Sequence, residues 1–149
     1  MGIGEDIQQK EFKSELSKAV INVVYTASWL NQRMGELFKG HDITRPQFNI
    51  LRILRGQHPK PATVNLLIER MLDKSSNASR IVDKLESKGL VLRKQCSDDR
   101  RAVDVLISAS GLQLLDELDK KVDELETGIW GLTEKESEEL NSLLDKMRL

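Results

Sequence analysis

The segment between Lys74 and Lys88 carries the side chains with the clearest capacity for chemistry in this chain of 149 residues. Its apolar residues recur at helical spacing and would face the core: Ala78, Ile81, Val82 and Leu85. The opposite face would then carry Ser76, Asn77, Arg80, Asp83, Lys84 and Ser87. Small hydrogen-bonding side chains at a helix start, with an arginine one turn later, suit the major groove of DNA, where Ser and Asn can read base edges and Arg can pair with guanine. An ordinary solvated helix face is the alternative.

Positive charge is concentrated in the middle of the chain. The formal net charge is only −1, yet residues 41–101 carry 13 basic and 7 acidic side chains, whereas residues 112–149 carry 5 basic and 11 acidic. Lys74 and Lys84 belong to the basic part and can hold phosphates, as the N-terminus of a helix also does. The split indicates a middle that binds nucleic acid and an acidic end that stays away from phosphates.

The segment after this predicted helix has the pattern of a basic β-hairpin. Residues 90–96 and 102–107 are rich in β-forming residues and are joined by a short polar link. Arg93, Lys94, Arg100 and Arg101 cluster in this hairpin, the last two near its tip. A thin ribbon that ends in guanidinium groups fits a minor groove, whose negative potential attracts arginine. The alternative is a basic edge whose charges prevent aggregation.

Long helices would flank these two features. Between residues 7 and 39 the apolar residues follow helical steps of three and four: Phe12, Leu16, Val20, Val23, Ala27, Leu30, Met34 and Leu37. A second apolar row, Ile21, Tyr25 and Trp29, lies on the opposite face. A helix that is apolar on two sides must be covered on two sides, so we infer a partner subunit.

The remaining elements complete a recognisable order. Thr44, Pro46 and Gln47 mark a helix start, and Thr63 can cap a short helix before the segment at 74–88. Another helix is expected from Leu112, and Thr133 begins a last one. The predicted fold is mainly α with a small β-hairpin: a winged helix-turn-helix domain at 41–111, flanked by a helical region at 1–40 and 112–149.

The chain resembles the MarR (multiple-antibiotic-resistance regulator) family of transcription factors. The run from Asp73 to Val91 is similar to that family's recognition-helix segment, and the run from Asp98 to Gly111 is similar to its wing. The wing's Asp-x-Arg element falls on Asp99 and Arg101. The order and spacing of these pieces extend the resemblance over nearly the whole chain.

The resemblance implies a homodimeric regulator, expected to be a repressor, that binds a palindromic operator in double-stranded DNA. The recognition helix, 74–88, would enter the major groove and the wing, 92–106, the minor groove. The implied DNA-binding residues are Lys74, Ser75, Ser76, Asn77, Ser79, Arg80, Lys84, Arg100 and Arg101. Asp99 and Arg101 would also shape the wing. The implied dimerisation residues are Phe12, Leu16, Val20, Val23, Leu125, Ile129, Leu140 and Leu144.

The resemblance also implies release from DNA by a small aromatic or anionic effector. Tyr25, Trp29 and Phe48 are candidates for lining its pocket, although ordinary core packing is the favoured interpretation of the aromatic residues on the long helix. The lone Cys96 and the two histidines, His41 and His58, make no metal cluster, so we expect no metal and no cofactor.

Other functional classes are disfavoured by what the sequence lacks. No Ser/His/Asp constellation or phosphate-binding glycine loop is found, which argues against an enzyme. No apolar run approaches the roughly 18 residues of a transmembrane helix, and no signal peptide is evident, so we expect a cytoplasmic protein. The remaining alternative is a helical protein-interaction module whose winged helix docks another protein.

Overall fold

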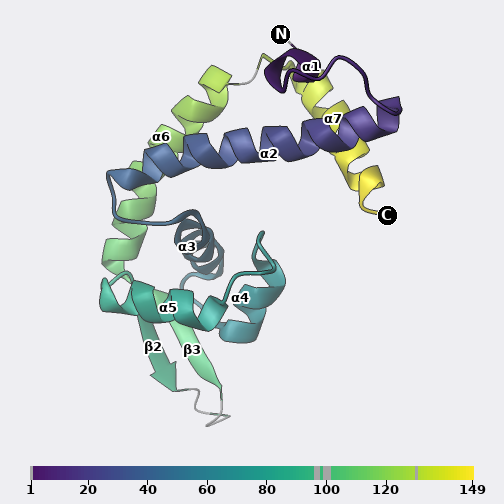
Figure 1. Cartoon of the computed structure of the whole chain (residues 1–149). Coiled ribbons are helices and arrows are strands. Elements are labelled where there is room, and N and C mark those ends of the chain that lie inside the picture. Colours follow the sequence, from purple (N-terminus) through teal and green to yellow (C-terminus); the bar gives the residue numbers. More distant parts are fainter. Residues whose placement is uncertain (1, 96–97, 99–101, 130) are drawn as a thin grey trace. The chain divides into compact units, whose positions relative to one another are not determined.

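The computed structural model describes residues 2–95, 98, 102–129 and 131–149. Within these residues the chain is mostly helical and has one small antiparallel sheet (Figure 1). It divides into two compact units, residues 1–115 and 116–149. The fold class predicted from the sequence, mainly α with a small hairpin, is therefore confirmed.

The first unit begins with a short helix and a long one. Helix α1 spans Ile3–Asp6 and α2 spans Glu15–Lys39. The expected single helix over 7–39 is wrong at its start, because Ser14 is extended and its hydroxyl accepts a hydrogen bond from the backbone N–H of Ser17 at 3.1 Å. That hydrogen bond caps α2 at Ser14. Phe12 therefore precedes the helix, and the Lys18 ammonium lies 5.7 Å from its ring centroid.

Three helices build the core of the first unit. Helices α3 (Arg45–Gln57), α4 (Val64–Arg70) and α5 (Ala78–Ser87) each begin at a residue whose side chain accepts a backbone hydrogen bond. Thr44 and Gln47 form the reciprocal capping box predicted for α3, and Thr63 caps α4 as expected. The fully buried side chains include Ile50, Leu51, Leu54, Leu67, Val82 and Leu85. Their burial joins the three helices around one apolar core.

A three-stranded sheet completes this domain. Strands β2 (Val91–Gln95) and β3 (Val103–Ile107) pair antiparallel with Arg93 opposite Val105, which confirms the predicted hairpin. The sequence pattern did not predict β1, the two residues Ala62–Thr63, which pair with the other edge of β3. The strand order is β1-β3-β2, so β3 is the central strand.

Hydrogen bonds around Gly111 join the sheet to the next helix. Helix α6 spans Ala109–Ile129 and begins earlier than the expected Leu112. The Ser108 hydroxyl donates to the carbonyl of Gly89 at 2.7 Å and accepts from the N–H of Gly111 at 3.0 Å. The Ser108 N–H donates to the carbonyl of Leu90 at 3.0 Å. Gly111 is consequently buried against the turn between α5 and β2.

The second unit contains the later part of α6 and helix α7, Glu134–Met147. Thr133 and Glu136 form the predicted capping box, in which hydrogen bonds from Thr133 hold the pKa of the Glu136 carboxyl below its usual value. Leu140, Leu143 and Met147 are exposed on α7. Across the described residues, no helix is both long enough and apolar enough to span a bilayer.

Candidate nucleic-acid interface

The helix predicted to read DNA is shorter than its sequence pattern suggested. We predicted a helix over 74–88, but α5 begins at Ala78. Asn77 is its N-cap, and its side-chain oxygen Oδ1 accepts the N–H of Arg80 at 3.1 Å. The Asn77 oxygen is thus engaged by the backbone, which leaves its amide group as the part that can donate to a base.

Asp73 organises the turn that leads into α5. Its Oδ1 accepts hydrogen bonds from the backbone N–H of Ser75 at 2.9 Å and the Ser75 hydroxyl at 2.6 Å, and its Oδ2 accepts the Ser76 hydroxyl at 3.1 Å. The hydrogen bonds from Ser75 are the main reason why the pKa of Asp73 lies below its ordinary value. Both serine hydroxyls donate to Asp73, so toward a ligand they are left with acceptor capacity.

Lys74 has a partner inside the chain. Its ammonium group donates to the carbonyl of Ile68 at 3.2 Å and to that of Glu69. These are among the last carbonyls of α4, which have no partner within a helix and carry its negative dipole end. The lysine that the sequence pattern assigned to phosphate binding therefore caps α4 in this structure.

The exposed side of α5 carries the cations that can reach a ligand. Ser79, Arg80 and Lys84 are all exposed, and they lie opposite the buried Ala78, Val82 and Leu85. Ile81, which was expected to face inward, is half-buried. Arg80 has no carboxylate partner within the part of the chain that the structure describes, so its guanidinium group can form a bidentate contact.

Arg93 on β2 is bound to α5. Its Nη2 forms an ion pair with Asp83 Oδ1, and its Nε lies 2.6 Å from Glu86 Oε2. The Arg93 side chain is 31% exposed, so this contact is partly shielded from water. From the sequence alone, Arg93 is one more cation of the predicted hairpin. Its pairing with two acidic residues on the neighbouring helix was missed, because nothing in the sequence indicates that residues 83, 86 and 93 lie close together.

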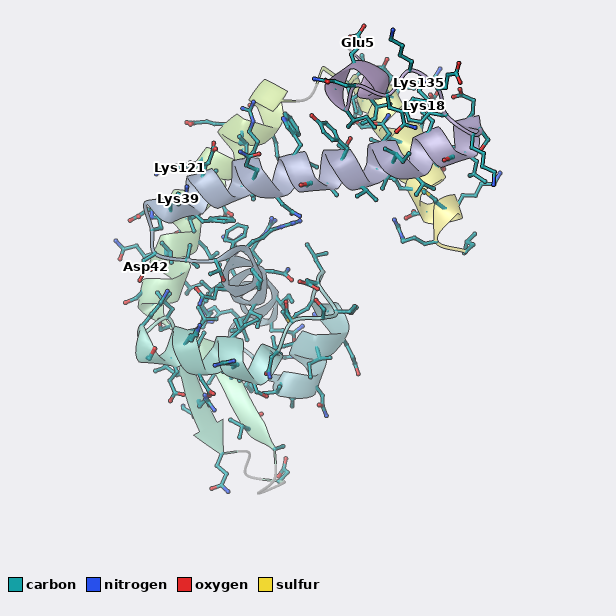
Figure 2. The ribbon with its side chains drawn as sticks, viewed as in Figure 1. Glu5, Lys18, Lys39, Asp42, Lys121 and Lys135 are labelled. Carbon is teal, nitrogen blue, oxygen red and sulfur yellow. The ribbon has the colours of Figure 1, made fainter. Side chains whose placement is uncertain are left out.

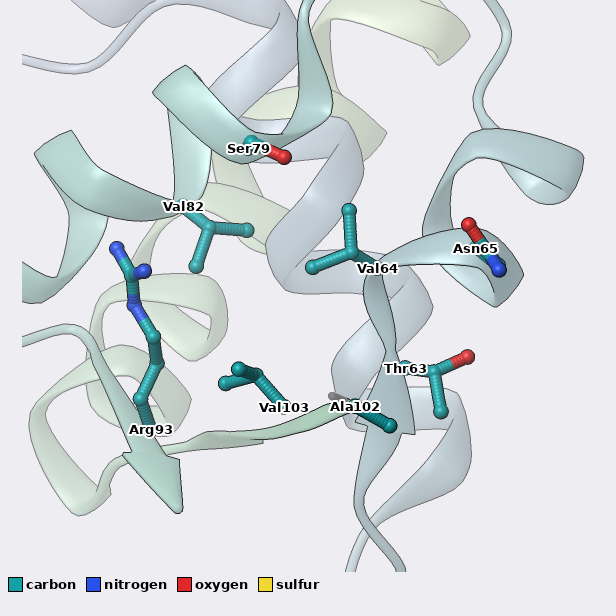
Figure 3. A pocket seen from close by; sticks show the side chains of 8 residues that line it. All are labelled: Thr63, Val64, Asn65, Ser79, Val82, Arg93, Ala102 and Val103. Atoms are coloured by element: carbon teal, nitrogen blue, oxygen red, sulfur yellow. The ribbon is translucent and has the colours of Figure 1, made fainter. Parts of the chain in front are cut away.

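A cavity of about 350 Å³ separates the start of α4 from α5 and the sheet. Figure 3 shows Thr63 and Asn65 at the α4 side and Arg93 rising from β2 beside Val82. Ser79 lines the same space from α5. The cavity is lined by Ser79 and Val82 of the helix that carries Arg80, so it lies beside the same surface.

The candidate aromatic pocket is divided between surface and core. Tyr25 is exposed and Trp29 is half-buried on α2, where the Arg33 guanidinium lies 5.1 Å from a Trp29 ring centroid. Phe48 is buried, and its ring centroid lies 4.8 Å from that of Phe38. Phe48 is therefore a core residue of the domain, and none of the three predicted pocket residues lines the cavity beside α5.

Several predicted residues lie outside the part that can be described. These are Asp99, Arg100 and Arg101 at the hairpin tip, and their roles stay predictions. The same holds for the side chain of Ile129. Figure 2 shows the side chains of the described residues, among them Asp42, which follows α2.

Lys88 fixes the other end of α5. Its ammonium group donates to the backbone carbonyl of Asp42 and lies 3.5 Å from the Asp42 carboxylate. It also lies 3.4 Å from Gln47 Oε1, the atom that accepts the N–H of Thr44 in the capping box of α3. The end of α5 is therefore attached to the connection between α2 and α3.

Known proteins resemble the chain in both sequence and structure. A family model described as "MarR family" matches residues 43–103. The transcriptional regulator MhqR of Bacillus subtilis is 27% identical over 121 residues, which cover 80% of this chain and 82% of MhqR. A MarR transcription factor from Planctomyces limnophilus superposes with a TM-score of 0.70 at 28% identity, covering 93% of this chain and 98% of that one. Staphylococcus aureus MepR in its DNA-binding conformation gives a TM-score of 0.70 at 25% identity, with coverage of 84% and 92%.

Proposed function

We propose that the chain is a DNA-binding transcriptional regulator of the MarR type, and that it works as a homodimeric, ligand-released repressor in the cytoplasm. Its operator would be a palindrome in double-stranded DNA. The N-terminal residues 1–40 and the C-terminal residues 112–149 would form the dimerisation region, and residues 41–111 the DNA-binding domain. Helix α5 would enter the major groove and the hairpin of β2 and β3 the minor groove.

The observation that carries the proposal is the cationic face of α5. Arg80 and Lys84 are exposed beside Ser79 on a helix whose other face is buried in the core. A rigidly held helix presents these groups in a fixed arrangement, which direct readout of base edges requires. The excess of basic over acidic residues in 41–101 extends the positive charge that attracts DNA phosphates beyond the helix itself.

The proposed dimer is supported by apolar side chains that the single chain leaves exposed. On α2 these are Leu16, at 74% exposed, together with Val20, Val23 and Val24. On α7 they include Leu140 and Leu143, the latter 64% exposed. Rows of large exposed apolar side chains mark surfaces that another protein covers. A second copy of this chain would cover them in a symmetric pair.

A fluorescence-anisotropy titration tests the DNA-binding proposal. The probes are labelled fragments from the region upstream of the chain's own gene, with a shuffled duplex as the control. Arg80 and Lys84 of two subunits provide four exposed cations. Because each releases counterions from DNA, the affinity should fall about a hundredfold when salt rises from about 50 to about 200 mM. Footprinting should show two half-sites about 10 base pairs apart. Binding that ignores salt and sequence would contradict the proposal.

A mass measurement in solution separates the proposed dimer from the alternative. Light scattering behind a sizing column should give twice the 16.9 kDa of one chain at micromolar concentration. A monomer that binds a foreign helical protein through α2 would instead support the protein-interaction module. Because Leu16 and Val20 are exposed in one chain, only the assembled state should shield them from solvent.

The proposed effector is a small aromatic or anionic molecule. Tyr25 and Trp29 on α2 offer partly exposed rings against which an aromatic molecule can stack. A thermal-shift screen with aromatic acids would identify such a ligand, because a compound that binds the folded state raises its midpoint. A true effector should also raise the Kd for DNA in the anisotropy titration.

A further inference from the structure

The geometry points to Arg93 as a positioning residue that keeps the carboxylates of α5 away from Arg80. Arg93 engages Asp83 through Nη2 and Glu86 through Nε, and both carboxylates belong to the helix proposed to read DNA. This inference rests on the proposed DNA-binding function. It assigns to a residue of the hairpin an effect on DNA that is exerted through the helix.

The position of Asp83 makes such a partner necessary. Asp83 follows Arg80 by three residues on α5, the spacing at which oppositely charged side chains pair on a helix surface. Asp83 is 60% exposed, so its carboxylate can turn toward Arg80 unless another cation holds it. A guanidinium group is suited to this task because it offers several donors in a fixed plane.

Arg93 comes from a strand that is itself held in place. Arg93 pairs with Val105 of the central strand β3, and Val91 at the start of β2 is buried. The contact is therefore made between two rigid elements, and the planar side chain passes beside Val82 at the cavity's edge (Figure 3). Two carboxylates that would repel phosphates are partly neutralised at the same time.

The test compares single and combined variants in the anisotropy titration of the full-length protein. Arg93→Gln should weaken operator binding about tenfold for the dimer, or about threefold for each subunit, because Asp83 is released to pair with Arg80. Adding Asp83→Asn to Arg93→Gln should restore binding to within about threefold of the unaltered protein. Asp83→Asn alone should leave binding nearly unchanged.

Lys94→Gln is the matched control. Lys94 is the next residue of β2 and is exposed, and its substitution removes the same charge as Arg93→Gln. Adding Asp83→Asn to this variant should not restore any affinity that it loses, because Lys94 lies on the other face of the strand. Unfolding followed by circular dichroism verifies that each variant is folded at the titration temperature.

Each outcome has a distinct meaning. Unchanged binding by Arg93→Gln overturns the inference. Weakened binding that Asp83→Asn does not restore also overturns it, because Arg93 then acts by touching DNA or by holding the hairpin alone. Failure of the unaltered protein to bind any fragment overturns the proposed function instead, and the two failures are therefore distinguishable.

Discussion

Replacement of Gly111 by alanine is expected to destabilise the protein by about 2–4 kcal/mol. A Cβ atom at this position would lie 2.4 Å from the carbonyl oxygen of Leu90 and 2.7 Å from Cγ1 of Ile107. The Leu90 carbonyl is fixed because it accepts the N–H of Ser108. The added methyl group can be accommodated only by moving the start of α6 away from the sheet.

Urea unfolding at fixed protein concentration measures this effect, with circular dichroism as the signal. Gly35→Ala is the control, because Gly35 lies inside α2 and a Cβ there meets nothing within 4 Å. Alanine is the better helix former, so Gly35→Ala should raise stability by about 0.5–1 kcal/mol. The proposed close contact would be contradicted if both variants changed the free energy of unfolding by the same amount, or if Gly111→Ala made the protein more stable.

The second large expected effect is the loss of operator binding in Arg80→Ala. Arg80 is exposed on α5 and has no carboxylate partner among the described residues, so its removal should leave the fold intact. A bidentate contact to guanine is worth about 1–3 kcal/mol, which corresponds to a loss of about 5-fold to 150-fold at each half-site. Discrimination against a changed base should weaken at the position that Arg80 reads.

Arg148→Ala is the matched control for Arg80→Ala. It removes the same charge from the C-terminal end of the chain, where Arg148 pairs with Asp145. Operator affinity should change by less than about twofold in this variant, since long-range charge effects are screened by salt. If both variants bind equally poorly, net charge rather than a specific contact explains the result. If Arg80→Ala is unfolded, Arg80 is a structural residue.

Local hydrogen-bonding chemistry was the most predictable part of the fold. The helix starts at Thr44, Thr63 and Thr133 were predicted correctly, because a capping residue and its partner lie within three positions of each other. The hairpin was predictable for a similar reason, since its two strands are close in the sequence. The overall order of elements followed from the periodicity and the capping residues of the individual segments.

Features that depend on competition between neighbours were predicted less well. The start of the recognition helix was placed too early, because Asp73 and Asn77 bind nearby backbone and hydroxyl groups that a continued helix would have used. Strand β1 was missed, because two residues carry no periodicity and their pairing with β3 is distant in the sequence. The ion pairs of Arg93 could not be predicted by counting charges, because its partners lie on another element.

The contacts of Lys88 give the molecule a mechanical connection that bypasses the sheet. Asp42 follows the last residue of α2 by three positions, and Lys88 directly follows α5. A shift of the end of α2 that displaces Asp42 must either break the Lys88 contacts or carry the end of α5 with it. A movement of the long helix α2 can therefore be transmitted to α5, the helix that bears Arg80, through the contacts of a single lysine side chain.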